Sequence, residues 1–102
     1  MPIINVTKDN FNEVVGSGKT VLLDFYADWC GPCRMVSPIV EQIAEECPQY
    51  TVGKVNVDNE QELAQQFGVM SIPMLAVMKD GKVAAQAVGA RPKQEILQML
   101  EE

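Results

Sequence analysis

Residues 21–33 have the sequence VLLDFYADWCGPC, and this stretch carries most of the information about the fold. Residues 20–27 are nearly all apolar on both faces, which is typical of a central β-strand covered by helices on both sides of its sheet. Asp24 is the exception within this run. The following segment has apolar residues at helical spacing, so Cys30 and Cys33 are predicted to lie where a strand passes into a helix.

This placement gives the two cysteines a definite chemistry. The unpaired N–H groups at the start of a helix favour an anion, so we expect a lowered pKa for the Cys30 thiol. The thiolate is the species that attacks a disulfide. Cys33 lies one helical turn further on, close enough to form a disulfide with Cys30 or to resolve a mixed disulfide there.

Three interpretations of this cysteine pair compete. A structural disulfide would close a loop of only four residues, which the chain-entropy relation values at about 2 kcal/mol. A structural zinc site needs four ligands, but the sequence has no His and no second CxxC pair, and its third cysteine, Cys47, lies about 21 Å further along the helix. A dithiol–disulfide couple needs no other group, and the strand–CxxC–helix context favours it.

Strand and helix signals alternate along the rest of the chain. Asp80 and Gly81 favour a tight hairpin, because both central positions of such a turn tolerate a positive φ. Pro38 is predicted to kink the long helix rather than end it. The expected strands span residues 3–6, 20–27, 52–57, 74–78 and 83–88, and the expected helices span residues 8–15, from the cysteine motif to about 47, 58–67, and from about 92 onward. The order βαβαβαββα predicts an α/β fold with a central mixed five-stranded β-sheet flanked by four α-helices.

Composition and charge exclude several classes of function. The chain of 102 residues supports one domain over residues 1–102. Its net charge of −6 argues against nucleic-acid binding, and the absence of His removes the commonest metal ligand, so no metal is expected. Residues 1–5 lack the features of a signal peptide, and no apolar run approaches the ~18 residues of a membrane span. We therefore expect a cytoplasmic, reducing location without membrane attachment.

The segment Trp29-Cys30-Gly31-Pro32-Cys33 is the WCGPC motif of thioredoxins, and the chain resembles that family from end to end. The matching residues outside the motif include Asp24, Phe25, Pro38, Ile72, Pro73, Asp80, Gly81, Val88, Gly89 and Ala90. The resemblance implies the thioredoxin fold and a protein-disulfide reductase. Thioredoxin is itself a standard example of the lowered cysteine pKa invoked above.

The resemblance also assigns roles to the two cysteines. Cys30 is implied to be the nucleophile that attacks a substrate disulfide, and Cys33 the residue that resolves the mixed disulfide. This reaction leaves a Cys30–Cys33 disulfide that a thioredoxin reductase reduces again. The resemblance further implies disulfide-containing protein substrates, no bound cofactor, and a monomer.

A buried carboxyl group at Asp24 admits two explanations. Burial disfavours the charged form and raises the pKa of a carboxyl group, which suits a proton acceptor near neutral pH. In the family that the chain resembles, the corresponding carboxylate lies behind the second cysteine and takes part in proton transfer through water. The alternative is a structural ion pair, for which Lys54 on the next strand is the candidate partner.

The other residues of the motif are expected to support Cys30. Trp29 is expected to be partly exposed beside the sulfur, because the loop after a strand commonly carries function. Gly31 allows a partner backbone to approach closely. Pro32 lacks an N–H group and stiffens the turn.

A second segment is implied to face the cysteines. By resemblance, the Ile72–Pro73 bond is cis and its backbone groups pair with an extended stretch of the substrate. The apolar patch around Cys30 is then expected to recognise backbone shape, and its members are Gly31, Pro32, Ile72, Pro73, Gly89 and Ala90.

Some residues depart from the commonest family pattern. Tyr26, the pair Met70-Ser71, and Met74 are all expected near the substrate groove, where they bear on partner choice. Cys47 is expected to be a small buried apolar residue rather than a regulatory thiol. Two other functions stay open: a disulfide oxidase or isomerase, which usually has a different residue pair between its cysteines, and a binding subunit that acts without redox turnover.

Overall fold

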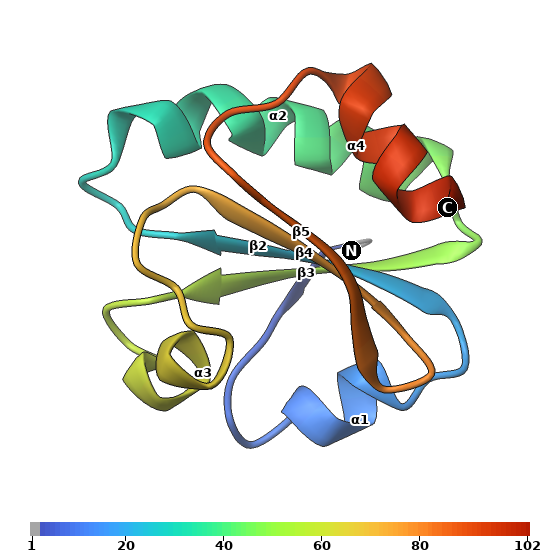
Figure 1. Cartoon of the computed structure of the whole chain (residues 1–102), viewed down its shortest axis with the longest axis horizontal. Helices are drawn as coiled ribbons and strands as arrows, with labels where there is room; N and C mark the ends of the chain where they lie inside the picture. The colour runs from blue at the N-terminus through green and yellow to red at the C-terminus, as the bar shows by residue number, and fades with distance from the viewer. Residues whose placement is uncertain (1–2) are drawn as a thin grey trace.

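The computed structural model describes residues 3–102, so Met1 and Pro2 of the predicted domain lie outside the described residues. It contains one five-stranded sheet in the order β1-β3-β2-β4-β5 (Figure 1). Its strands are β1 (Ile3–Asn5), β2 (Thr20–Tyr26), β3 (Tyr50–Asn56), β4 (Met74–Lys79) and β5 (Lys82–Val88). The first three strands run parallel, whereas β4 pairs antiparallel with both β2 and β5. The predicted mixed α/β sheet is confirmed.

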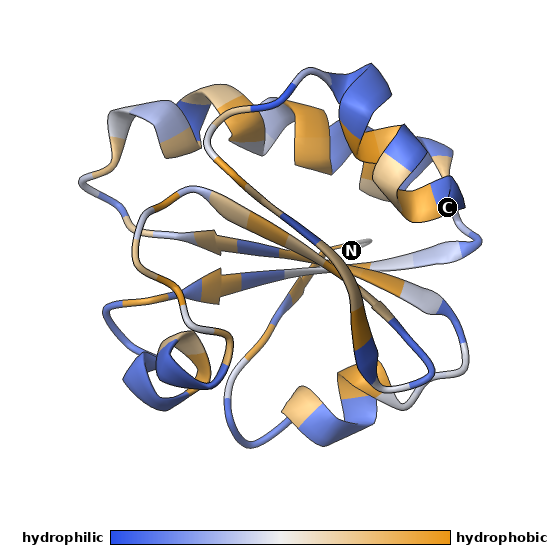
Figure 2. Cartoon of the chain, in the orientation of Figure 1, coloured by the Kyte–Doolittle hydropathy of each residue, from blue (hydrophilic) through white to orange (hydrophobic). Residues whose placement is uncertain are grey.

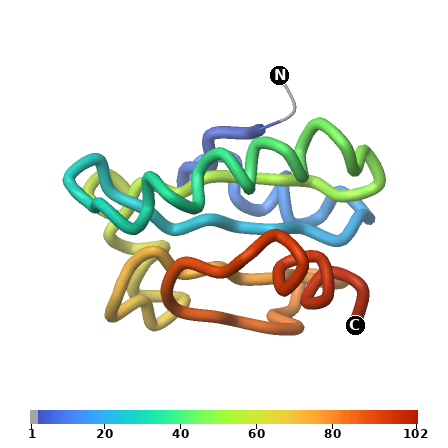
Figure 3. The backbone as a smooth tube through the Cα atoms, turned by 90° about the horizontal axis from the view of Figure 1, so that it is seen from above, coloured from blue at the N-terminus to red at the C-terminus, as the bar shows by residue number. Residues whose placement is uncertain are grey.

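Four helices cover the two faces of this sheet. They are α1 (Phe11–Val15), α2 (Gly31–Glu46), α3 (Gln61–Gln66) and α4 (Lys93–Glu101). Helices α2 and α4 lie on one face, and α1 and α3 lie on the other (Figures 1 and 3). Apolar residues of α2 and α4 pack in the core on this face of the sheet, and both helices carry hydrophobic and hydrophilic residues in turn along their length (Figure 2). Helix α2 continues through Pro38, which therefore does not end it.

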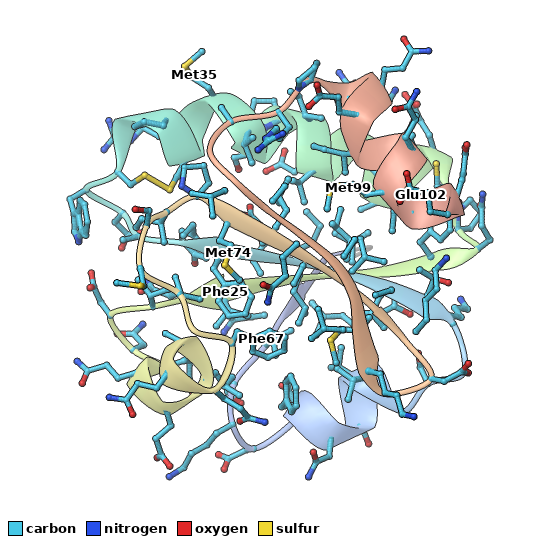
Figure 4. The ribbon with its side chains drawn as sticks, viewed as in Figure 1. Phe25, Met35, Phe67, Met74, Met99 and Glu102 are labelled. Carbon is cyan, nitrogen blue, oxygen red and sulfur yellow. A yellow bond between two sulfur atoms is a disulfide. The ribbon has the colours of Figure 1, made fainter. Side chains whose placement is uncertain are left out.

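The central strand β2 contributes to both hydrophobic cores. Its side chains alternate, so Leu22 packs under α2 and α4 while Leu23 and Phe25 pack on the opposite face. Phe25 also stacks at a tilt against Phe67, with their ring centroids 5.0 Å apart (Figure 4). Asp24 shares the α2 face with Leu22, so the strand alternation points its carboxyl group toward the helix that carries the cysteines.

Two predicted helix starts were wrong, and each error has a local cause. The helix expected from residue 8 begins only at Phe11, because the Asn10 side chain accepts a hydrogen bond from the Thr7 N–H and holds a turn there. The helix expected to be capped by Asp58 begins at Gln61, because the Asp58 carboxylate accepts a hydrogen bond from the Trp29 side chain instead. The last helix begins directly after Pro92, close to its predicted start.

The predicted hairpin between β4 and β5 is confirmed. Asp80 and Gly81 have φ values of 54° and 76°, both in the left-handed region. An aspartate and a glycine adopt this region more readily than most residues do, so two residues suffice to reverse the chain. The hairpin places β5 at the edge of the sheet and returns the chain toward the cysteines.

Candidate active site

Cys30 and Cys33 form a disulfide at the start of α2, visible as the yellow bond in Figure 4. Their Cα atoms are 5.3 Å apart. Cys30 is the N-cap residue of the helix, and its Sγ accepts a hydrogen bond from the Cys33 backbone N–H at 3.2 Å. Pro32 occupies the first turn, where its missing N–H leaves no hydrogen bond unmade. The helix start therefore directs the Cys33 N–H toward the sulfur of Cys30, in agreement with the prediction that helix-start N–H groups face this sulfur.

The loop that leads into the motif is exposed and is held by side-chain contacts. Trp29 is 70% exposed, and its Nε1–H donates to the Asp58 carboxylate at 2.9 Å. Arg34 donates a hydrogen bond to the Asp28 carbonyl oxygen at 3.0 Å. Gly31 is exposed beside the disulfide, and an added Cβ there would meet no atom within 4 Å. The site thus presents the exposed ring of Trp29 and open space at Gly31 next to the disulfide. Cys30 and Cys33 themselves are each only 4% exposed.

The segment before β4 lies against the disulfide. The peptide bond between Ile72 and Pro73 is cis, and the carbonyl oxygen of Ile72 is 3.8 Å from Cys30 Sγ. The Pro73 carbonyl oxygen accepts a hydrogen bond from the Gly89 N–H at 2.8 Å. Gly89 has a φ of +95°, a conformation that glycine adopts without strain. These contacts bring together the start of α2, the start of β4 and the end of β5, with Ala90 exposed just beyond.

Asp24 is the only charged residue that is buried within residues 3–102. It is 1% exposed, and neither of its carboxylate oxygens has a hydrogen-bond partner in the described structure. Burial raises its pKa from 3.8 to about 6, and the nearby positive charge of Lys54 opposes that rise. The group therefore changes its charge close to neutral pH.

Within the described residues 3–102, Lys54 does not form the structural ion pair with Asp24 that was the alternative explanation for this carboxyl group. The two residues are direct neighbours in the register of β2 and β3, yet the Lys54 Nζ donates to the Ser37 Oγ at 3.2 Å. The same ammonium lies 4.4 Å from the centroid of the Tyr26 ring, a distance that allows a cation–π contact. Asp24 is therefore left without a bonded counter-ion.

Ser37 also belongs to this site, although no sequence motif pointed to it. Ser37 is half-buried and faces the sheet with Cys33, which precedes it by four residues on the same helix face. The spacing of four residues from Cys33 is the sequence signal that could have placed Ser37 at the site. A small cleft of about 140 Å³ runs between these residues, lined by Tyr26, Ala27, Asp28, Cys33, Arg34, Ser37 and Lys54.

The residues that depart from the common family pattern lie in different environments. Met70 is 95% exposed, and Ser71 is exposed next to it. Met74 directly follows Pro73, but its side chain is buried in the core on the side of α1 and α3 and does not line the surface (Figure 4). Cys47, expected to be a small buried apolar residue, is half-buried at the end of α2 and packs against the core on the α2 side.

Comparisons with known proteins agree with this geometry. A family model described as Thioredoxin matches residues 2–102. The chain belongs to the thioredoxin family. A relative named Thioredoxin from Bacillus subtilis (strain 168) is 41% identical over 101 residues, which cover 98% of this chain and 96% of that protein. Another, from Streptomyces clavuligerus, is 47% identical over 94 residues, covering 91% and 88%.

The fold also agrees with a solved thioredoxin structure. A mutant thioredoxin from Halobacterium salinarum NRC-1 matches with a TM-score of 0.91 and 36% identity, covering 97% of this chain and 88% of that one. Family membership and the paired cysteines make the chain a thiol-disulfide oxidoreductase with protein-disulfide reductase activity. Within residues 3–102, no three His, Cys, Asp or Glu side chains are grouped to hold a metal ion, and no helix is long and apolar enough to cross a membrane.

Proposed function

We propose that Cys30 and Cys33 perform the two successive steps of disulfide reduction. In the reduced protein, the Cys30 thiolate attacks one sulfur of a substrate disulfide, which forms a mixed disulfide and releases one substrate thiolate. The Cys33 thiolate then attacks Cys30 Sγ, which releases the second substrate thiolate and closes the Cys30–Cys33 disulfide. Two electrons pass to the substrate, and two protons from solvent or from nearby acids neutralise the released thiolates.

The observation that carries this assignment is the hydrogen bond from the Cys33 N–H to Cys30 Sγ at the helix start. A backbone N–H and the positive end of the α2 dipole both stabilise negative charge on the Cys30 sulfur. In the second step Cys30 Sγ is the sulfur that Cys33 attacks, and the substrate thiolate is the leaving group. Cys30 also faces the Ile72 carbonyl oxygen and the open side of the motif, where a substrate disulfide has access.

Asp24 accepts the proton of Cys33 in this proposal. Its raised pKa keeps the carboxyl group within range of proton exchange near neutral pH, and its side chain lies on the α2 face of the sheet. The transfer runs through water. Lys54 supports the group electrostatically, since its positive charge lowers the pKa of Asp24 and opposes the effect of burial.

The substrate segment binds across the surface next to Cys30. The Pro73 carbonyl is already bonded to Gly89, so the peptide groups of Ile72 are the ones nearest to the sulfur that can pair with an extended chain. Trp29 provides an exposed aromatic surface beside this position. Gly31, Pro32 and Ala90 complete the patch without bulky side chains, so substrate backbones of different sequence fit it.

Several broader properties belong to the same proposal. The chain forms one domain over residues 1–102, acts as a monomer in the cytoplasm, and binds neither nucleic acid nor membranes. Its redox-active disulfide replaces a bound cofactor. Disulfide-containing proteins are its substrates, and a separate thioredoxin reductase returns it to the dithiol form.

The two cysteine roles are tested by trapping. With a purified disulfide-containing protein as substrate, the Cys33→Ser variant is expected to accumulate a covalent complex that reductant dissolves, because nothing attacks the mixed disulfide at Cys30. The Cys30→Ser variant should form no such complex, and non-reducing electrophoresis measures both. Equal trapping by the two variants contradicts the assignment. The double Cys30→Ser and Cys33→Ser variant is the control, and it retains function only if the chain acts as a binding subunit.

A further inference from the structure

Three side chains from three elements meet around one positive charge behind the active site. The Lys54 ammonium, from β3, donates to the hydroxyl of Ser37 on α2 at 3.2 Å. It also lies 4.4 Å from the centroid of the Tyr26 ring, at the end of β2. All three residues line the cleft of about 140 Å³ that also reaches Cys33. The ammonium is therefore fixed within the cleft by a hydrogen bond on one side and an aromatic ring on the other.

In this position the Lys54 ammonium does not bond to the Asp24 carboxylate, which its charge alone would favour as a partner. Asp24 is the direct neighbour of Lys54 in the register of β2 and β3, and neither of its carboxylate oxygens has a hydrogen-bond partner among residues 3–102. A buried carboxylate strongly favours a bonded cation, because it cannot be solvated by water. The acceptor that Lys54 uses instead is the Ser37 hydroxyl.

The other groups around Asp24 offer no replacement for Lys54. Arg34, from α2, bonds to the Asp28 carbonyl oxygen at the surface. Asp28 in the loop, Tyr26 on β2 and Cys33 on α2 carry no positive charge. On β4, the neighbour of Asp24 in the register is Leu75, and α4 contributes the apolar Ile96 and Leu100 to the core on this face. Among residues 3–102, Lys54 is thus the cation that lies beside Asp24 in the sheet, and its ammonium is bonded to Ser37.

We infer that Ser37 is a positioning residue that holds the Lys54 ammonium in the cleft and away from Asp24, and thereby sets the pH at which Asp24 gains and loses its proton. This inference rests on the proposed role of Asp24 as the proton acceptor for Cys33. An ammonium bonded to the carboxylate would stabilise its ionised form and make it a weaker base. The serine hydroxyl keeps the carboxylate basic, while the ammonium remains close enough to limit the cost of ionisation.

The test is a titration of the Asp24 carboxyl carbon by NMR in the oxidised protein. In Ser37→Ala, Lys54 loses its hydroxyl acceptor and moves to Asp24, so the titration midpoint is expected to fall by about one pH unit or more. Ser37→Thr keeps a hydroxyl and should keep the wild-type midpoint. In a Lys54→Met background, Ser37→Ala should leave the midpoint unchanged, because the cation is absent. An unchanged midpoint in Ser37→Ala, or an equal fall with and without Lys54, overturns the inference.

A second measurement separates this inference from the proposed role of Asp24. The rate of the resolving step, followed as decay of a mixed disulfide at pH 7, should fall in both Asp24→Asn and Ser37→Ala. If Asp24→Asn resolves as fast as the wild type, the proton-acceptor role fails, yet the titration still decides whether Ser37 positions Lys54. Ser17→Ala is the matched control, because it removes an exposed serine hydroxyl far from the cysteines and should change neither result.

Discussion

The buried carboxyl group of Asp24 should make the stability of the oxidised protein depend on pH. Burial raises its pKa from 3.8 to about 6, so the folded state holds this proton more tightly than the unfolded chain does. Binding of this proton to Asp24 stabilises the folded state, and that stabilisation is fully present below pH 3.8 and is lost as the pH rises through about 6. The difference between the two pKa values corresponds to about 3 kcal/mol.

The Asp24→Asn substitution removes this titration while keeping a side chain of the same shape. We expect the unfolding free energy of the variant, relative to the wild type, to increase by about 3 kcal/mol between pH 3.5 and pH 8. The asparagine amide stays neutral across that range, so it does not require the desolvation of a charge. Denaturant unfolding of the oxidised proteins, followed by circular dichroism at steps of one pH unit, measures the difference directly.

This prediction is tested by how the difference in unfolding free energy between Asp24→Asn and the wild type changes with pH, and not by its size at any one pH. An asparagine amide without partners has its own cost, which shifts the whole difference curve by a constant amount. Asp9→Asn is the matched control, because Asp9 is exposed to solvent and its difference curve should stay nearly flat. A flat curve for Asp24→Asn would show that burial does not control the protonation of this carboxyl group.

Two further predictions follow from the neighbours of Asp24 on β3. Lys54→Met removes the positive charge that lowers the pKa of Asp24, so the pKa should rise above 6 and the loss of stability should extend to higher pH, measured by the same unfolding series. Gly53→Ala places a Cβ atom 2.5 Å from a methyl group of the fully buried Val6. Overpacking of this kind should cost about 1–3 kcal/mol in denaturant unfolding, and a neutral result would contradict the prediction by showing that Val6 can move away.

Much of the architecture could be predicted from the sequence, because local patterns express it strongly. The apolar run of residues 20–27 has the composition of a strand with both faces covered, and β2 lies at the centre of the sheet. Asp80 and Gly81 adopt the backbone conformation that a tight hairpin requires. In both cases a few neighbouring residues determine the result, and their energetic preferences point in the same direction.

The errors arose where a side chain had two possible partners. Asp58 has the spacing of a helix cap, yet in the folded protein its carboxylate bonds to Trp29, which is 29 residues away in the sequence. A serine is usually exposed to solvent, yet the Ser37 hydroxyl accepts a hydrogen bond from Lys54 on β3. Hydrogen bonds to charged groups such as these are worth about 1.5–3 kcal/mol whichever partner is used, so packing decides between the partners.

The chemistry of the cysteine pair is a local property and follows from the sequence. A residue at the N-cap of a helix faces backbone N–H groups wherever that helix lies, and Cys33 follows one turn later along the same helix. The surroundings of the pair depend on chain topology. Strand order and register bring Ile72, Gly89 and Lys54 to the cysteines from distant parts of the sequence, and such contacts form only when the sheet is assembled.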